Sequence, residues 1–128
     1  MANRPATARY TKSHEWVIVQ GDTATVGITD YAVEHLGELV FVSLPDKGRA
    51  LKGGEVAAEV ESVKAVGEVY APVDGTVTET NSALGNDQQP LAKDPFGSGW
   101  LWKCKVKAGA GAGLMDADAY AKFLTTLS

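Results

Sequence analysis

Lys64 lies between two segments of the sequence that each have the pattern of a β-strand. Residues 55–61 alternate between apolar and polar side chains, which is typical of a half-buried strand. Residues 68–71 form a second candidate strand, and it ends at the turn-forming Pro-Val-Asp-Gly sequence of residues 72–75. The pattern therefore predicts that Lys64 lies at the tip of a β-hairpin.

The chemistry open to Lys64 is that of an exposed primary amine. Such a lysine keeps its ammonium charge and is a poor Schiff-base nucleophile, because that role needs desolvation or a cationic neighbour. The amine is still accessible to an enzyme that acylates it. The ordinary alternative is a solvated surface charge with no further role. Two features favour acylation: the turn lacks the Asn-Gly or Asp-Gly sequence of tight hairpins, and Val63 exposes an apolar side chain beside the lysine.

Residues 54–77 resemble the attachment hairpin of lipoyl and biotinyl proteins, in which a lysine between two strands receives a carboxylic-acid cofactor in amide linkage. Biotinyl modules place Met on both sides of that lysine, whereas residues 61–65, Glu-Ser-Val-Lys-Ala, are similar to the H-protein family of the glycine cleavage system. Further motifs of this family occur in order between Tyr10 and Leu124. They are Tyr10 to Trp16, Gly27-Ile28-Thr29, His35-Leu36-Gly37, Leu44-Pro45, Ala71-Pro72 with Gly75, and Gly97 to Trp100.

The resemblance implies a mainly β fold. It is expected to be a flattened barrel-sandwich hybrid, like a lipoyl domain, with a short internal helix and a C-terminal helix. The resemblance also implies lipoic acid as a covalent cofactor, held on Lys64 as N6-lipoyllysine. Recognition of the attachment hairpin is assigned to Glu61, Ser62, Val63 and Ala65.

In this family the loaded arm carries an aminomethyl group on a lipoyl sulfur and folds back into a surface cleft. The resemblance places Ser13, Glu15, His35 and Glu68 at that cleft. An aminomethyl ammonium is a cation with several donors, so Glu15 and Glu68 are suited to accept charge-assisted hydrogen bonds from it. Ser13 is able to accept another. Shelter in the cleft would protect the adduct from attack by water.

The function that the resemblance implies is that of a non-catalytic carrier in glycine catabolism and one-carbon metabolism. The arm on Lys64 would take the aminomethyl group of glycine from a PLP-dependent glycine decarboxylase (P protein) to a tetrahydrofolate-dependent aminomethyltransferase (T protein). A dihydrolipoamide dehydrogenase (L protein) would then reoxidise the dithiol, which is thiol–disulfide exchange chemistry. A lipoate ligase or an octanoyl or lipoyl transferase would load the lysine.

Other functions are compatible with parts of this pattern. A relay in lipoate metabolism would use Lys64 to accept octanoyl or lipoyl groups and pass them to other lipoyl proteins. A hydrolase would need its own nucleophile and base, and its turnover would survive Lys64→Arg. A pure interaction module would tolerate the same substitution.

The chain departs from the family pattern at two places. Glu68 stands where the family usually has Asp, and Gly67 stands where it has a residue other than Gly. Residues 88–92 read Gln-Gln-Pro-Leu-Ala, whereas the family usually has Pro-Glu-Leu-Val-Asn ahead of the following turn. These changes bear on the contact geometry of the cleft and on the local turn, and not on attachment at Lys64.

Composition narrows the function classes independently. With 128 residues and 45% hydrophobic content, a single domain is expected over residues 10–128, preceded by a disordered segment at residues 1–9. A net charge of −4 without a basic cluster argues against nucleic acid as a partner. No apolar run approaches the roughly 20 residues of a membrane span, and no secretory signal is evident, so a cytoplasmic, bacterial-type protein is expected.

The remaining reactive residues have structural interpretations. Cys104 is the single cysteine, which excludes an intramolecular disulfide and a cysteine-based metal site. It alternates with Trp102 and Val106 against three lysines and is expected to be a small core residue. The two histidines, His14 and His35, lack ligand-like spacing, so no metal site is predicted.

The remaining elements follow from local patterns. Further strands are expected at residues 16–19, 23–26, 39–42 and 76–80, a helix at 31–36, and turns over residues 81–99. The Gly-Ala repeat at residues 109–113 predicts a flexible linker. It leads to a C-terminal helix over residues 116–127, whose apolar stripe would be Met115, Ala119, Phe123 and Leu127.

Overall fold

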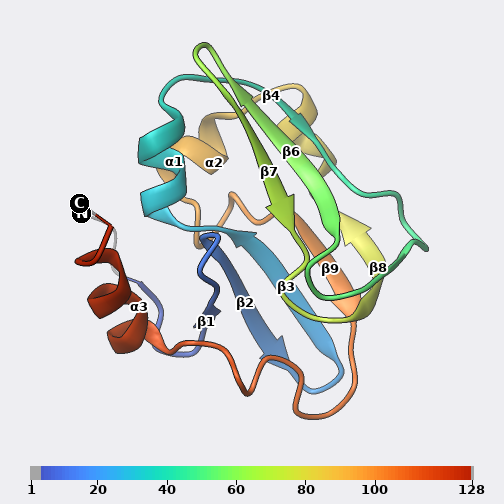
Figure 1. Ribbon diagram of the computed structural model, residues 1–128. Helices are drawn as coiled ribbons and strands as arrows, with labels where there is room; N and C mark the ends of the chain where they lie inside the picture. The colour runs from blue at the N-terminus through green and yellow to red at the C-terminus, as the bar shows by residue number, and fades with distance from the viewer. Residues whose placement is uncertain (1–3, 128) are drawn as a thin grey trace.

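The protein is described by a computed structural model that covers residues 4–127. Two antiparallel sheets pack face to face, one with strand order β1-β2-β3-β9-β8-β5 and one with order β4-β6-β7 (Figure 1). The larger sheet contains β1 (Arg9–Tyr10), β2 (Glu15–Gln20), β3 (Thr23–Ile28), β5 (Ala50–Leu51), β8 (Gly75–Thr80) and β9 (Trp102–Lys105). The smaller contains β4 (Leu39–Ser43), β6 (Val56–Ser62) and β7 (Val66–Tyr70).

This architecture confirms the predicted fold class, a mainly β sandwich with few helices. The main core lies between the sheets, where Val26 of β3 and Val77 of β8 are buried in one cluster with Val60 of β6. Alternation along each strand sends these side chains to the inner face and polar neighbours to solvent. The two sheets therefore share one hydrophobic core, and the small sheet can carry its hairpin on a rigid base.

Strand β9 has the alternation that the sequence predicts. Trp102 and Cys104 are buried, whereas Lys105 is exposed. Burial raises the pKa of the Cys104 thiol above its ordinary value. The prediction that Cys104 is a core residue is confirmed.

The internal helix α1 (Asp30–Leu36) also follows its sequence signals. The hydroxyl of Thr29 accepts a hydrogen bond from the backbone N–H of Ala32 at 3.3 Å and caps the first turn. At the other end, the helix stops at Gly37, which has a φ of 81° that only glycine adopts without strain. Figure 1 shows α1 on the side of the molecule from which the chain leads into β4.

Several short elements were not predicted. Strands β1 and β5 have two residues each, and the region predicted as turns contains a 3-10 helix, η1 (Ser82–Gly85), and helix α2 (Gln89–Lys93). The unusual segment at residues 88–92 forms most of α2. Pro90 lies in its first turn, where its missing N–H costs nothing, and Leu91 is fully buried. The displaced proline is therefore accommodated by a helix start.

The start of the described chain packs against the body, so the prediction of disorder is wrong for residues 4–9. The Arg4 guanidinium forms an ion pair with Asp30 at 3.0 Å, Ala8 is fully buried, and Arg9 begins β1. Residues 1–3 of that prediction lie outside the described residues. The assignment of residues 10–128 to one domain stays a prediction.

The C-terminal helix α3 (Ala117–Leu124) is shorter than predicted, although Asp116 caps it as expected. The predicted stripe is wrong: Ala119 and Leu127 are exposed, and Tyr120 is the fully buried residue of the helix. Tyr120 joins a second apolar cluster in which Phe123 and Leu124 are partly buried. Residues 109–113 before the helix form consecutive turns, and their flexibility stays a prediction.

Tyr120 anchors α3 through its hydroxyl. This hydroxyl lies 2.8 Å from Nδ1 of His14 and 2.7 Å from the Thr29 hydroxyl, which caps α1. The tyrosine ring stacks on Tyr10 with 4.9 Å between ring centroids. His14 has a φ of 74°, which is rare for a residue other than glycine. Burial lowers the pKa of its imidazole, and the nearby His35 lowers it further. One phenol thus joins α3, the strained turn before β2 and the start of α1.

Burial of Tyr10 and Tyr120 predicts a loss of stability at high pH. Desolvation raises the pKa of each phenol to about 12, whereas the pKa of a tyrosine in the unfolded chain is about 10. Because the unfolded state loses these protons first, the contribution to stability is complete below about pH 10 and is lost as the pH rises towards 12. Urea unfolding between pH 8.5 and 11.5 should show this loss. Tyr10→Phe and Tyr120→Phe should each reduce the slope of the unfolding free energy against pH. The titration of lysines contributes equally to all three proteins and so cancels in this comparison. Equal slopes in the three proteins would contradict the assignment of this loss to the two phenols.

Candidate functional site

The tip of the β6–β7 hairpin is held by hydrogen bonds around Ser62. The Ser62 backbone N–H donates to the carbonyl of Ala65 at 2.8 Å, and the Ala65 N–H donates to the Ser62 hydroxyl at 3.1 Å. The Val63 N–H donates to the carbonyl of Glu38 at 3.0 Å, which ties the tip to the chain before β4. These bonds replace the Asn-Gly chemistry that the turn lacks. The hairpin projects at one end of the molecule (Figure 1).

Lys64 is exposed at this tip, as the sequence predicts. Within residues 4–127, no side chain forms an ion pair or hydrogen bond with its amine. The lysine stem passes close to Gly37, where an added Cβ would lie 3.5 Å from its Cε atom. The amine is therefore accessible, and the stem runs back along the end of α1.

The four predicted cleft residues, Ser13, Glu15, His35 and Glu68, line one pocket of about 200 Å³. They come from three separate parts of the chain: the turn before β2 together with the first residue of β2, helix α1, and strand β7. The rest of the lining is apolar apart from the glycine and consists of Ile28, Ala32, Leu36, Val60, Gly67 and Val69. The pocket thus combines carboxylates and a hydroxyl with a largely hydrophobic wall.

Glu15 is the buried charged group of this pocket, with only 1% of its surface exposed. Its Oε1 accepts hydrogen bonds from the hydroxyls of Ser13 at 2.6 Å and Thr11 at 2.5 Å. Its Oε2 accepts from the backbone N–H of Tyr70 at 3.1 Å. An ionised carboxylate has about four acceptor positions, so these three donors compensate the buried charge and leave capacity for one more. Thr11 was missed by the sequence reasoning, because the turn over residues 11–14 that brings its hydroxyl to Glu15 carries no strand or helix periodicity.

His35 and Glu68, like Ser13, are exposed residues of the pocket lining. The Nδ1 atom of His35 lies 3.0 Å from the carbonyl of Tyr31, and the two rings stack with centroids 4.0 Å apart. Glu68 accepts a hydrogen bond from the Tyr70 hydroxyl at 3.3 Å, and its negative charge raises the pKa of that phenol. The pocket lining thus includes one exposed carboxylate, Glu68, and one buried carboxylate, Glu15.

Gly67 determines the depth of the same pocket. A Cβ at this position would lie 3.2 Å from the Cδ2 atom of Leu36, which is closer than most real contacts. A larger residue would therefore push Leu36 or reduce the pocket. The absence of a side chain at Gly67 leaves this space open beside the exposed Glu68.

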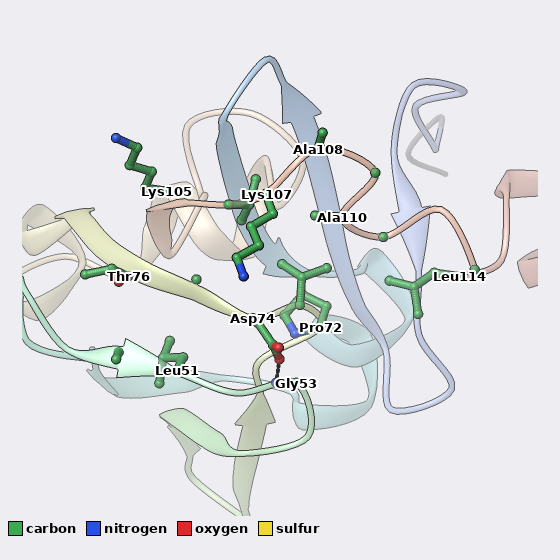
Figure 2. Close-up of a pocket in the computed structure, with 17 residues that line it drawn as sticks. Leu51, Gly53, Pro72, Asp74, Thr76, Lys105, Lys107, Ala108, Ala110 and Leu114 are labelled. Carbon is green, nitrogen blue, oxygen red and sulfur yellow. Dashed lines mark hydrogen bonds between the residues drawn. The ribbon is translucent and has the colours of Figure 1, made fainter.

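A larger pocket of about 680 Å³ lies away from these residues, between the β5–β8 edge and the loop that leads to α3 (Figure 2). In Figure 2 the Lys107 side chain extends over the pocket, whereas Lys105 points away from it. The Asp74 carboxylate accepts a hydrogen bond from the Gly53 N–H at 2.7 Å. None of the predicted site residues lines this pocket.

Metal binding and membrane crossing are two further possibilities to consider for residues 4–127. This part of the chain contains no group of three or more His, Cys, Asp or Glu residues that could hold a metal ion. Its helices are too short or too polar for any of them to cross a membrane.

Comparisons with known proteins show the family of the chain. A family model described as Glycine cleavage H-protein matches residues 8–127. The "Glycine cleavage system H protein" of Caulobacter vibrioides is 52% identical over 120 residues, covering 93% of this chain and 99% of that protein. The protein of the same name from Beutenbergia cavernae is 50% identical over 117 residues, covering 91% and 93%.

A solved structure shows the same fold. The crystal structure of a glycine cleavage system H protein from Mycobacterium marinum superposes with a TM-score of 0.87 at 41% sequence identity. The superposition covers 95% of this chain and 99% of that protein. With a family match over nearly the whole chain, relatives of about the same length and a common fold, the chain belongs to the glycine cleavage H-protein family.

Proposed function

We propose that this protein is the lipoyl carrier of a glycine cleavage system, with lipoic acid in amide linkage to Lys64. The observation that carries the proposal is the position of one exposed lysine at the tip of a braced hairpin, together with a pocket lined by Ser13, Glu15, His35 and Glu68. The family supports the carrier role.

The residues present fit a lipoyl group. Attachment needs an accessible primary amine, which Lys64 supplies, and a turn that an acylating enzyme can recognise, for which Glu61, Ser62, Val63 and Ala65 are the candidates. The lipoyl arm is an aliphatic chain that ends in a cyclic disulfide, so it needs an apolar surface to lie against, and the walls of the pocket supply one. When bound, the lipoyl group supplies a disulfide that accepts the aminomethyl group of glycine and two reducing equivalents.

The chain's own task is to hold a cationic cargo and exclude water. Glu15 retains acceptor capacity beyond its three protein donors, and Glu68 faces solvent with its carboxylate available. Both can accept charge-assisted hydrogen bonds from an ammonium. The Ser13 hydroxyl donates to Glu15, so its oxygen can still accept. His35 would form part of the wall.

The partners follow from this role. A PLP-dependent glycine decarboxylase would supply the aminomethyl group, and a tetrahydrofolate-dependent aminomethyltransferase would remove it. A dihydrolipoamide dehydrogenase would restore the disulfide, and a lipoate ligase or an octanoyl or lipoyl transferase would load Lys64. The carrier itself would have no catalytic activity.

Replacing Lys64 should abolish modification. Protein produced in cells that contain lipoate ligase should show a lipoyl-sized mass increment, and peptide mapping should place it on Lys64. Lys64→Arg should remove the increment without changing the thermal unfolding midpoint, because the side chain is exposed. Lys52→Arg, at another exposed lysine, serves as the matched control. An increment that persists in Lys64→Arg would contradict the proposal.

Glu15→Gln should preserve modification and weaken protection of the cargo. Loss of one charge-assisted hydrogen bond should accelerate release of formaldehyde and ammonia from the loaded protein by about tenfold or more. Glu79→Gln, an exposed change on β8, should have no effect. The release rate is measured on loaded, partner-free protein, after circular dichroism has shown that each variant is folded. A relay protein would need Lys64 but not Glu15, so equal release rates would favour that alternative.

A further inference from the structure

The outer face of the small sheet carries an apolar patch beside the hairpin tip. Among residues 4–127, the exposed large hydrophobic side chains are Val40, Phe41, Val63, Val66 and Leu127. All of these except Leu127 lie on β4 or on the β6–β7 hairpin. Scattered exposed hydrophobic residues are ordinary on a protein surface, but a cluster of them in one place is a mark of a binding surface.

Strand register explains why the patch is continuous. Phe41 of β4 pairs with Glu61 of β6, and Glu61 pairs with Val66 of β7. Residues directly opposite in antiparallel strands have their side chains on the same face, so these three form one row across the sheet. Phe41 is 47% exposed and Val66 is 59% exposed, which places the row on the solvent side.

A β-bulge extends the patch towards the tip. The register of β4 shifts between Leu39 and Phe41, so Val40 is the extra residue and both Val40 and Phe41 are exposed. Bulges change the direction of side chains and often occur beside functional sites. Val63, which is 70% exposed, continues the apolar surface to the residue that precedes Lys64.

The charges on this face are acidic. Glu61 lies between the two apolar side chains of the row. The next outward row consists of Ser43, Glu59 and Glu68, all of them exposed. A complementary partner would present an apolar recess flanked by lysine or arginine side chains.

We propose that this face, formed by Val40, Phe41, Val63 and Val66 with Glu59 and Glu61, is the docking surface for the enzyme that acylates Lys64. The inference rests on the proposed function. An enzyme that uses a long flexible arm can engage it at a distance from the hairpin. An enzyme that acylates the amine must come within bonding distance of Nζ and therefore contacts the surface around the tip.

The chemical step explains the need for close contact. The Lys64 amine, as the free base, attacks the acyl carbon of an acyl adenylate that the enzyme makes from lipoate and ATP. A C–N amide bond forms, and the C–O bond to the phosphate breaks with its electron pair going to AMP. The proton of the amine passes to solvent. Docking through the apolar face would hold Nζ at the adenylate during this exchange.

Steady-state acylation of the full chain tests the inference, with purified lipoate ligase, lipoate and ATP as the probe. Phe41→Ser should raise KM for the carrier by about fivefold to tenfold and leave kcat unchanged, because the substitution removes an anchoring side chain and not a reacting group. Val66→Thr, which keeps the β-branched shape, should act in the same direction. Leu127→Ser removes the exposed hydrophobic residue outside this face and should leave KM unchanged.

Charge gives a second readout. Glu61→Gln should raise KM and reduce its dependence on salt, because a charge between the apolar anchors affects the rate of encounter. Thermal unfolding midpoints equal to that of the unaltered chain exclude misfolding as the cause. Unchanged KM in both Phe41→Ser and Val66→Thr, or an equal rise in Leu127→Ser, would overturn the docking inference. No acylation of the unaltered chain at Lys64 would instead overturn the proposed function.

Discussion

The hydrogen bond from the Tyr70 backbone N–H to the buried Glu15 carboxylate connects the two sheets at the site. Glu15 begins β2 of the large sheet, and Tyr70 ends β7 of the small one. A buried carboxylate is costly unless donors surround it, so the turn that supplies Ser13 and Thr11 and the edge of β7 must both be in place. The charge therefore fixes the position of the hairpin base relative to the pocket.

Two kinds of support act on the hairpin and its pocket. The hairpin is held by its own strand pairing, by bonds around Ser62, and by one bond from Val63 to Glu38 just before β4. The pocket is assembled from distant segments and depends on packing from outside, where the Tyr120 hydroxyl reaches both His14 and Thr29. Thr29 in turn caps the helix that supplies His35. The terminal helix thus contributes to the geometry of a pocket that it does not line, whereas the position of Lys64 depends on the hairpin turn and its bond to Glu38.

The local sequence patterns were sufficient to predict those elements that neighbouring residues determine, such as alternating strands and capped helices. Alternation placed Lys64 between two strands, and capping residues located α1 to within one residue of its bounds. Tyr120 was missed because its burial depends on Tyr10 and His14, more than a hundred residues away, and a regular helical stripe pointed instead to Ala119 and Leu127. Helix α2 was missed because it is only five residues long, contains a proline, and lies between the turn-forming sequences Asn86-Asp87 and Asp94-Pro95. Its formation is favoured by the burial of Leu91, which the local pattern does not reveal. The family resemblance, rather than any periodicity, brought the four pocket residues together.

The position of Cys104 has a consequence for redox chemistry. Thiol–disulfide exchange requires a thiolate that can reach a disulfide sulfur. Cys104 is the single cysteine of the chain; it is buried in β9, and its raised pKa keeps it protonated at neutral pH. A protein that presents a disulfide on its own surface must avoid forming a mixed disulfide with itself or with another copy. Enclosing its sulfur in the core keeps the carrier inert towards the group that we propose it carries.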